Sequence, residues 1–160
     1  MPSNKFIAFA LAAVVAAVAT LAIAQDVTKT PDPALAALTP EEMVLKRQAI
    51  MKEDGGILKG AGALSGADAV AAADHLVTNF SNLTALFPEG SAVGETGALP
   101  VIWEKHADFQ AIFANAVAKA TEMKAAAEAG DADAYAASIK TIGGFCGQCH
   151  ETFRKKKEQS

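Results

Sequence analysis

Two cysteines and a histidine near the C-terminus carry the clearest chemistry in the sequence. They form the C-x-x-C-H pattern Cys146-Gly147-Gln148-Cys149-His150. Two thiols at this spacing can add to the two vinyl groups of a porphyrin, and the following histidine can bind the iron from one face. On a helix, positions i, i+3 and i+4 share one side, so the three side chains can face one macrocycle. The motif therefore predicts one covalently bound haem c.

Other uses of a C-x-x-C pair fit this chain less well. A thioredoxin-like redox site needs a preceding strand and a βαβ context, whereas an alanine-rich helical pattern precedes this motif. A zinc site needs four ligands, but the chain has only two cysteines, and His75 and His106 lie far apart in sequence. A disulfide between Cys146 and Cys149 would close a very short loop. Haem attachment is the preferred interpretation.

Residues 1–24 have the pattern of a secretory signal. Lys5 supplies a positive start, residues 6–24 are almost entirely apolar, and residues 22–24 form a small-x-small cleavage site. We predict a mature N-terminus at Gln25 and a periplasmic location. An uncleaved membrane anchor is the alternative, because the apolar run is nearly long enough to span a bilayer.

The remaining 136 or so residues suit a single domain, residues 39–160, preceded by a loosely ordered polar leader, residues 25–38. The net charge of −4 becomes more negative when the signal is removed, because the signal contains one lysine and no acidic residue. An acidic chain is a poor candidate for binding nucleic acid. The basic run 154–157 is expected to close the last helix and interact with its dipole, or alternatively to dock an acidic redox partner.

The first helix is predicted over residues 40–63. Thr39 can cap it, Pro40 suits its first position, and Glu42 completes a capping box. The glycine pair 55–56 is expected to interrupt this helix with a kink or a close contact, since each glycine costs about 1 kcal/mol relative to alanine.

Three more helices follow, over residues 66–85, 100–129 and from 132 onward, with a long loop at 87–99. Ser65 is expected to cap the first of these three. Apolar residues recur on each at steps of three, four and seven, as a bundle interior requires. The expected inner residues are Val70, Ala73, Leu76, Phe80 and Leu83, then Ile102, Phe109, Phe113, Ala116, Ala120 and Met123, then Tyr135, Ile139, Ile142, Cys146, Cys149 and Phe153. No segment has strand-like alternation, so we predict an all-α, antiparallel up-down four-helix bundle that holds the haem.

The export signal, the four helices and the C-terminal C-x-x-C-H together resemble the class II c-type cytochromes. This family includes cytochrome c′ and the low-spin cytochromes c-556. Its most specific matches are residues 47–52, Ile102-Trp103 with Phe109, and residues 143–154. Cytochrome c′ is itself a standard example of the up-down bundle, so the architecture and the resemblance are not independent expectations.

The resemblance implies roles for individual residues. Cys146 and Cys149 would be the thioether attachments and His150 the proximal iron ligand. Arg154 would lie near the proximal imidazole, and Arg47 near a haem propionate, with a solvated surface charge as the alternative for Arg47. The first helix would cover the far face of the haem.

Met51 matches the family position that faces the distal side of the iron. If its thioether binds, the iron is six-coordinate and low-spin, and the protein is a periplasmic electron carrier. If Met51 only packs nearby, an open site would bind NO or CO, as in five-coordinate cytochrome c′. Met51-Lys52-Glu53-Asp54-Gly55 resembles the low-spin group, which favours ligation.

Several further expectations follow from this interpretation. An electron carrier has no catalytic residue, so no enzymatic activity is expected. Its partners would be periplasmic redox proteins, and an acidic, alanine-rich surface is compatible with a monomer or a homodimer. His75 and His106 are competing candidates for the sixth ligand, but both are expected on outward or interhelix faces, which disfavours them. Trp103 is expected in the bundle core.

Overall fold

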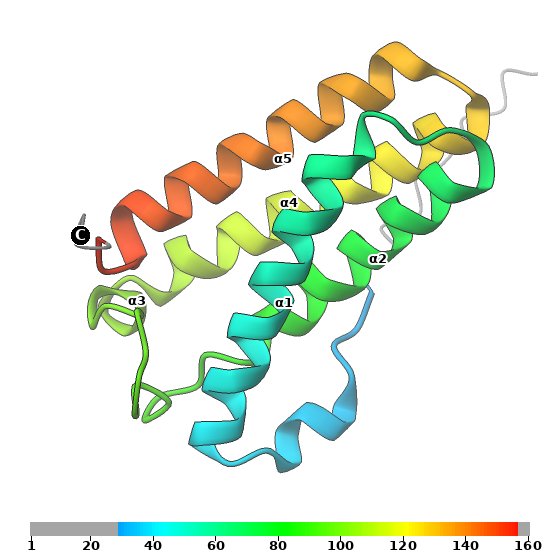
Figure 1. Ribbon diagram of the computed structural model, residues 1–160. Coiled ribbons are helices and arrows are strands. Elements are labelled where there is room, and N and C mark those ends of the chain that lie inside the picture. Colours follow the sequence, from blue (N-terminus) through cyan, green and yellow to red (C-terminus); the bar gives the residue numbers. More distant parts are fainter. Residues whose placement is uncertain (1–28, 157–160) are drawn as a thin grey trace, which may run out of the picture.

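The computed structural model describes residues 29–156, so the predicted signal, its cleavage site and the predicted mature N-terminus at Gln25 lie outside the described residues. Figure 1 shows the helices of the described part in an antiparallel up-down bundle, which confirms the predicted fold class. The elements are η1 (Pro33–Ala37), α1 (Pro40–Ala61), α2 (Gly66–Thr84), α3 (Val101–Glu104), α4 (His106–Ala129) and α5 (Ala132–Phe153). Within residues 29–156, no helix is both long and apolar enough to cross a membrane.

Three of the long helices make the main packed layer. α2 packs along α4, and α4 packs along α5, whereas α1 crosses them at an angle, lies mainly on α2 and touches α5 only slightly (Figure 1). The interior contains the apolar faces of these helices together with the aromatic rings of Phe87, Phe109, Phe113 and Phe153. These rings meet largely edge to face, with Phe109 centroids 5.1 Å from both Phe113 and Phe153.

α1 begins as the sequence predicts. The Thr39 hydroxyl accepts a hydrogen bond from the Glu42 amide, and the Glu42 carboxylate accepts one from the Thr39 amide. The predicted interruption at residues 55–56 is wrong, because the helix runs unbroken through both glycines to Ala61. Neither glycine is needed for close approach to another helix, since a Cβ at either position would meet no protein atom within 4 Å.

α2 differs from expectation in two details. Ser65 precedes the helix, but its side chain makes no capping hydrogen bond. Val70 is only half-buried, whereas the other predicted inner residues, Ala73, Leu76, Phe80 and Leu83, are buried. The inner face of α2 is therefore set mainly by its second half.

The predicted third helix, residues 100–129, is divided into α3 and α4. Lys105 leaves the helical conformation with φ −116° and ψ 43°. Trp103 explains the change of direction, because its indole Nε1 donates to the carbonyls of Phe87 and Pro88 in the preceding loop. Trp103 is half-buried rather than plain core, so α3 is directed by this loop and α4 by the bundle.

The chain leaves α5 at Phe153, so the basic residues from Arg154 onward follow the last helix rather than close it. Arg154 is extended and pairs with Ala98 in an isolated antiparallel bridge. The Leu99 amide donates to the Phe153 carbonyl at 3.0 Å, and the Lys155 amide donates to Gly97 at 2.8 Å. These bonds hold the end of α5 against the loop at 85–100.

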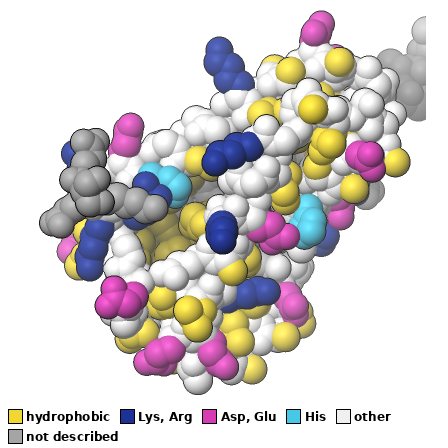
Figure 2. Space-filling view, viewed as in Figure 1, with side chains coloured by type: hydrophobic (Ala, Val, Ile, Leu, Met, Phe, Trp, Pro, Cys, Tyr) yellow, Lys and Arg dark blue, Asp and Glu magenta, His cyan; other side chains and the backbone are white. Residues whose placement is uncertain are grey.

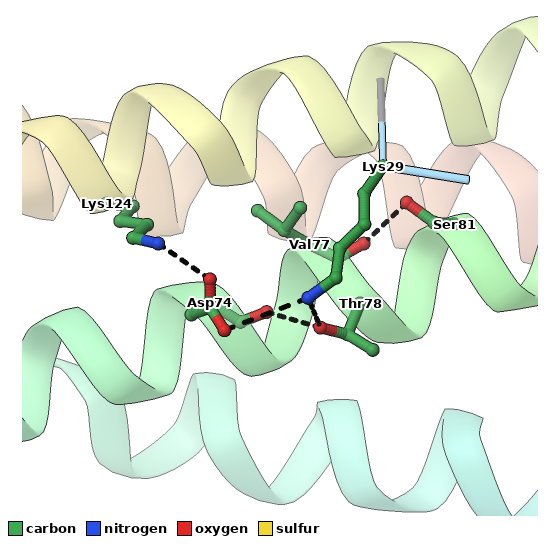
Figure 3. Close-up of polar contacts among 6 residues, drawn as sticks. All are labelled: Lys29, Asp74, Val77, Thr78, Ser81 and Lys124. Atoms are coloured by element: carbon green, nitrogen blue, oxygen red, sulfur yellow. Dashed lines mark hydrogen bonds and ion pairs between the residues drawn. The ribbon is translucent and has the colours of Figure 1, made fainter. Parts of the chain in front are cut away.

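The described part of the leader is ordered, which corrects the expectation of a loose segment. Leu35 of η1 is buried in the core, and the Asp32 amide donates to Asn82 at 2.9 Å. Lys29 reaches α2, where it donates to Thr78 and lies 3.9 Å from the Asp74 carboxylate (Figure 3). Lys124 of α4 binds the same carboxylate at 2.7 Å, so Asp74 links the leader to two helices.

Candidate functional site

The last three turns of α5 bring the C-x-x-C-H side chains to two adjacent cavities. The larger, about 460 Å³, lies between α1, the loop at 85–100, α3 and the end of α5. The smaller, about 130 Å³, lies deeper between α1, α2, α4 and α5. Met51, Cys149 and His150 line both, so the two cavities meet at these three residues.

The cavity walls are mostly apolar, with charge near the opening. Figure 2 shows hydrophobic side chains on the floor of a hollow between α1 and the end of α5, with basic side chains around it. The apolar wall residues include Phe87, Ile102, Phe109 and Phe153 in the larger cavity, and Phe80, Leu83, Ile112, Phe113, Ala116, Ile142 and Phe145 in the smaller.

This donor set fits a covalently bound haem. Cys146 and Cys149 are both free thiols, which removes the alternative of a disulfide in this structure. Both thiols and the His150 imidazole border the apolar space, while Arg47, Lys52 and Arg154 bring positive charge to the wall of the larger cavity, where Lys52 and Arg154 could pair with the carboxylates of a haem. The α-helical spacing of the motif thus produces the common face that the sequence predicts.

Burial controls the protonation of the three motif residues. It raises the pKa of the Cys149 thiol to about 11, with a further contribution from Cys146 that Arg154 partly offsets. It also raises the pKa of Cys146, to which the charge of Asp54 adds. For His150, burial and the neighbouring Arg154 lower the pKa, which favours the neutral imidazole that an iron ligand requires.

Arg47 is not the solvated charge that the sequence left open, because only 3% of it is exposed. Its guanidinium donates four hydrogen bonds across to the loop after α2, at 2.9–3.1 Å. It also lies over the ring of Phe87, 4.4 Å from the centroid. The acceptors are the carbonyls of Leu86 and Ser91 and the hydroxyls of Ser91 and Thr96. The guanidinium therefore fastens the cavity-lining loop to α1.

Met51 and Arg154 both line the larger cavity, Met51 from α1 and Arg154 from just beyond the end of α5. Met51 is half-buried on α1, one turn after Arg47, and lines both cavities. Arg154 is exposed just beyond α5, and its Cγ lies 3.4 Å from where a Cβ on Gly97 would stand. The backbone bridge to Ala98 holds Arg154 beside the larger cavity.

Two histidines lie away from the cavities, as expected. His75 and His106 are both exposed and line neither cavity. His75 pairs with Glu53 at 3.3 Å, and His106 lies 3.2 Å from the Gln110 amide.

Sequence reasoning missed the loop that receives Arg47 and the buried carboxyl of Asp54. Ser91 is 1% exposed and Asp54 is 4% exposed. A weak sequence signal existed for Asp54, which follows Met51 by three residues and therefore lies near its face of α1. No local signal pointed to Ser91 or Thr96, because their partner is more than 40 residues away.

Comparison with known proteins gives the same assignment. The family model described as Cytochrome C′ matches residues 42–154. Cytochrome c-556 of Agrobacterium tumefaciens (strain II Chrys) is 38% identical over 121 residues, which cover 71% of this chain and 98% of the relative. Cytochrome c-554 of Cereibacter sphaeroides is 42% identical over 87 residues, covering 48% of this chain and 65% of that relative, just under two thirds of its length.

Among solved structures, cytochrome c′ from Rhodopseudomonas palustris superposes with a TM-score of 0.64 at 32% identity. The match covers 72% of this chain and 98% of that one. Proteins of this family carry covalently bound haem c, and the C-x-x-C-H motif for its attachment is present here at residues 146–150. The chain belongs to the cytochrome c′ family of class II c-type cytochromes.

Proposed function

We propose that this protein is a periplasmic electron carrier whose single haem c is bound through Cys146 and Cys149, with His150 and Met51 as axial ligands. The observation that carries this proposal is the shared wall of the two cavities. Met51 and His150 come from α1 and α5, yet both line both cavities. Two ligands from facing helices, directed into one apolar space, suit a six-coordinate iron.

The chain's own residues would prepare this site in three ways. The low pKa of His150 keeps its imidazole free to bind metal near neutral pH. Arg47 and the loop that it fastens hold α1, and with it Met51, against the cavity. The aromatic walls keep water from the interior, and that limits reorganisation around a changing charge. The haem supplies the one-electron chemistry, and Met/His ligation raises its reduction potential.

Gas binding is the second candidate function. It is favoured by the apolar walls of the smaller cavity and by the partial exposure of Met51. If Met51 stays unbound, the distal side would be an apolar pocket open to NO or CO. Absorption spectra distinguish this candidate from the first.

The partner of an electron carrier would meet the opening of the larger cavity. Lys52 and Arg154 line that opening, and Lys155 and Lys156 follow as exposed residues. We propose a redox protein with an acidic surface as the partner, although the chain as a whole is acidic. A homodimer through α1 is also proposed, because Leu45 on its outer face is 68% exposed.

The test is a comparison of wild type with Met51→Ala after maturation in an exporting host. Wild type should give a low-spin spectrum, a weak sulfur-to-iron band in the near-infrared of the oxidised form, and little CO binding. Met51→Ala should become high-spin and bind CO readily. Met43→Ala, a buried methionine on the same helix that lines neither cavity, is the control and should keep the wild-type spectrum. An unchanged spin state in Met51→Ala would remove Met51 from the ligand set.

A further inference from the structure

Asp54 is a buried carboxyl group that takes no part in the proposed haem attachment or axial ligation. It lies on α1 and lines the smaller cavity together with Cys146, Cys149 and His150. One oxygen, Oδ1, accepts a hydrogen bond from the Asn79 amide at 2.7 Å. The other, Oδ2, is buried and has no hydrogen-bond partner among the described residues. A buried oxygen without a partner is costly, and it therefore calls for an explanation.

The charged groups around Asp54 do not neutralise it. The preceding residue, Glu53, is also acidic. Its Oε2 accepts a hydrogen bond from the same Asn79 amide at 3.2 Å. His75 of α2 is paired with Glu53 at 3.3 Å rather than with Asp54. Within residues 29–156, Asp54 has no ion pair with a lysine or arginine.

The smaller cavity gives the carboxylate of Asp54 mostly apolar surroundings. Asn79 of α2 donates to Oδ1, and apart from the three C-x-x-C-H side chains the walls of the smaller cavity are largely aromatic and aliphatic. In such surroundings the field of a carboxylate is weakly screened, and it acts on groups in the same cavity. The Cys146 thiol lines the same cavity, and its pKa is raised first by burial and then by the charge of Asp54.

We propose that Asp54 tunes the reduction potential of the haem iron. Its carboxylate lowers this potential because a nearby negative charge favours the oxidised, more positive state. This inference rests on the proposed haem attachment and redox role, but not on which atom is the sixth ligand. The asparagine bond fixes the carboxylate on the cavity wall. Burial keeps solvent and salt from screening it.

The experiment measures reduction potentials of the haem-loaded protein at pH 8.5 for wild type, Asp54→Asn and Glu53→Gln. The pH is chosen because burial raises the pKa of Asp54 to about 7, so that its carboxylate is ionised in this buffer. Glu53→Gln is the matched control, since it removes the same charge from the neighbouring residue, whose side chain is 46% exposed. Asp54→Ser is a second neutral variant in case the asparagine variant folds poorly.

The expected result is a shift to more positive potential in both Asp54 variants, several-fold larger than in Glu53→Gln, with an unchanged spin state. The shift should persist at 0.5 M salt, whereas that of Glu53→Gln should shrink, because exposed charges are screened. Equal shifts in the two positions, or a shift abolished by salt, would overturn the proposal. The proposed ligation fails separately, through the spin state of Met51→Ala.

A second measurement uses the haem-free chain. The pH dependence of alkylation gives the pKa of the Cys146 thiol in a Cys149→Ser background. Asp54→Asn should lower that pKa, while Glu53→Gln should leave it nearly unchanged. A Cys146 pKa that does not respond to Asp54→Asn would show that the carboxylate does not act across the cavity, and would refute the proposed mechanism.

Discussion

Removal of the Arg47 side chain should destabilise the protein more than any other single polar truncation on α1. Arg47→Ala deletes four hydrogen bonds that cross from α1 to the loop at 86–96. Two acceptors, the carbonyls of Leu86 and Ser91, are buried and cannot turn away, whereas the two hydroxyls can rotate to other partners. Hydrogen bonds to a charged group contribute about 1.5–3 kcal/mol each, so two carbonyls left without partners give a loss of about 3–6 kcal/mol.

That loss is a large part of the 5–15 kcal/mol by which native domains are stable. Urea unfolding followed by helical circular dichroism of the haem-free chain measures it directly. Arg47→Lys is an informative companion, because an ammonium keeps the charge but cannot span four acceptors with the fork geometry of a guanidinium. It should fall between wild type and Arg47→Ala.

Gln48→Ala is the matched control for this series. The neighbouring Gln48 also crosses to the loop, with one hydrogen bond from Nε2 to the Glu95 carbonyl at 2.8 Å, but that bond is exposed. Its loss should cost less than about 1 kcal/mol, since water replaces it. If Arg47→Ala were no more destabilising than Gln48→Ala, the conclusion that the buried guanidinium fastens the loop would be refuted.

Three further outcomes are expected. The Cys149 thiol of the folded haem-free chain should react with iodoacetamide about 100-fold more slowly than a free thiol. The reason is that a pKa of about 11, against an ordinary 9.0, leaves about 100-fold less thiolate. Reaction in native buffer as fast as in the unfolded chain would contradict this. Trp103→Phe should cost about 1–2 kcal/mol in urea unfolding, since the carbonyls of Phe87 and Pro88 lose their common donor; no loss would show that water serves both equally well. Asp54 should make the haem-free chain less stable as pH rises from about 4 to 7. Its pKa is about 7 in the folded state and 3.8 ordinarily, so in this range the folded state holds a proton that the unfolded state has released. This loss, up to about 4 kcal/mol, should be absent from Asp54→Asn, and parallel pH profiles of the two proteins would contradict it.

The elements that the sequence predicted well are those with local causes. The capping box at Thr39 and Glu42 uses residues three apart, and both of its hydrogen bonds are present. The apolar steps through Phe109, Phe113 and Met123 predicted buried positions, and all three are buried. The common face of Cys146, Cys149 and His150 follows from helical spacing alone.

The errors have distant causes. The division of the third helix at Lys105 depends on the indole of Trp103 reaching carbonyls 15 and 16 residues earlier in the chain. The order of the leader depends on Leu35 entering a core built by later helices and on Asp32 meeting Asn82, 50 residues away. Periodicity within one segment contains no information on such contacts.

The error at the glycine pair 55–56 was to give a local helix propensity too much weight. A propensity penalty of about 1 kcal/mol per glycine is real, but 22 residues of continuous helix and the packing of α1 on α2 outweigh it. Arg47 lines the larger cavity, and its hydrogen bonds give it a structural role that the sequence did not predict. Its acceptors lie 39 to 49 residues away, on a loop with no regular pattern.

The most direct test of the whole account is whether one haem remains bound to the denatured chain. The protein should be matured in an exporting host, unfolded, assayed by pyridine haemochrome, and treated with an alkylating reagent. We predict one haem per chain, with neither Cys146 nor Cys149 alkylated. A colourless chain with both thiols alkylated would contradict the account at its foundation.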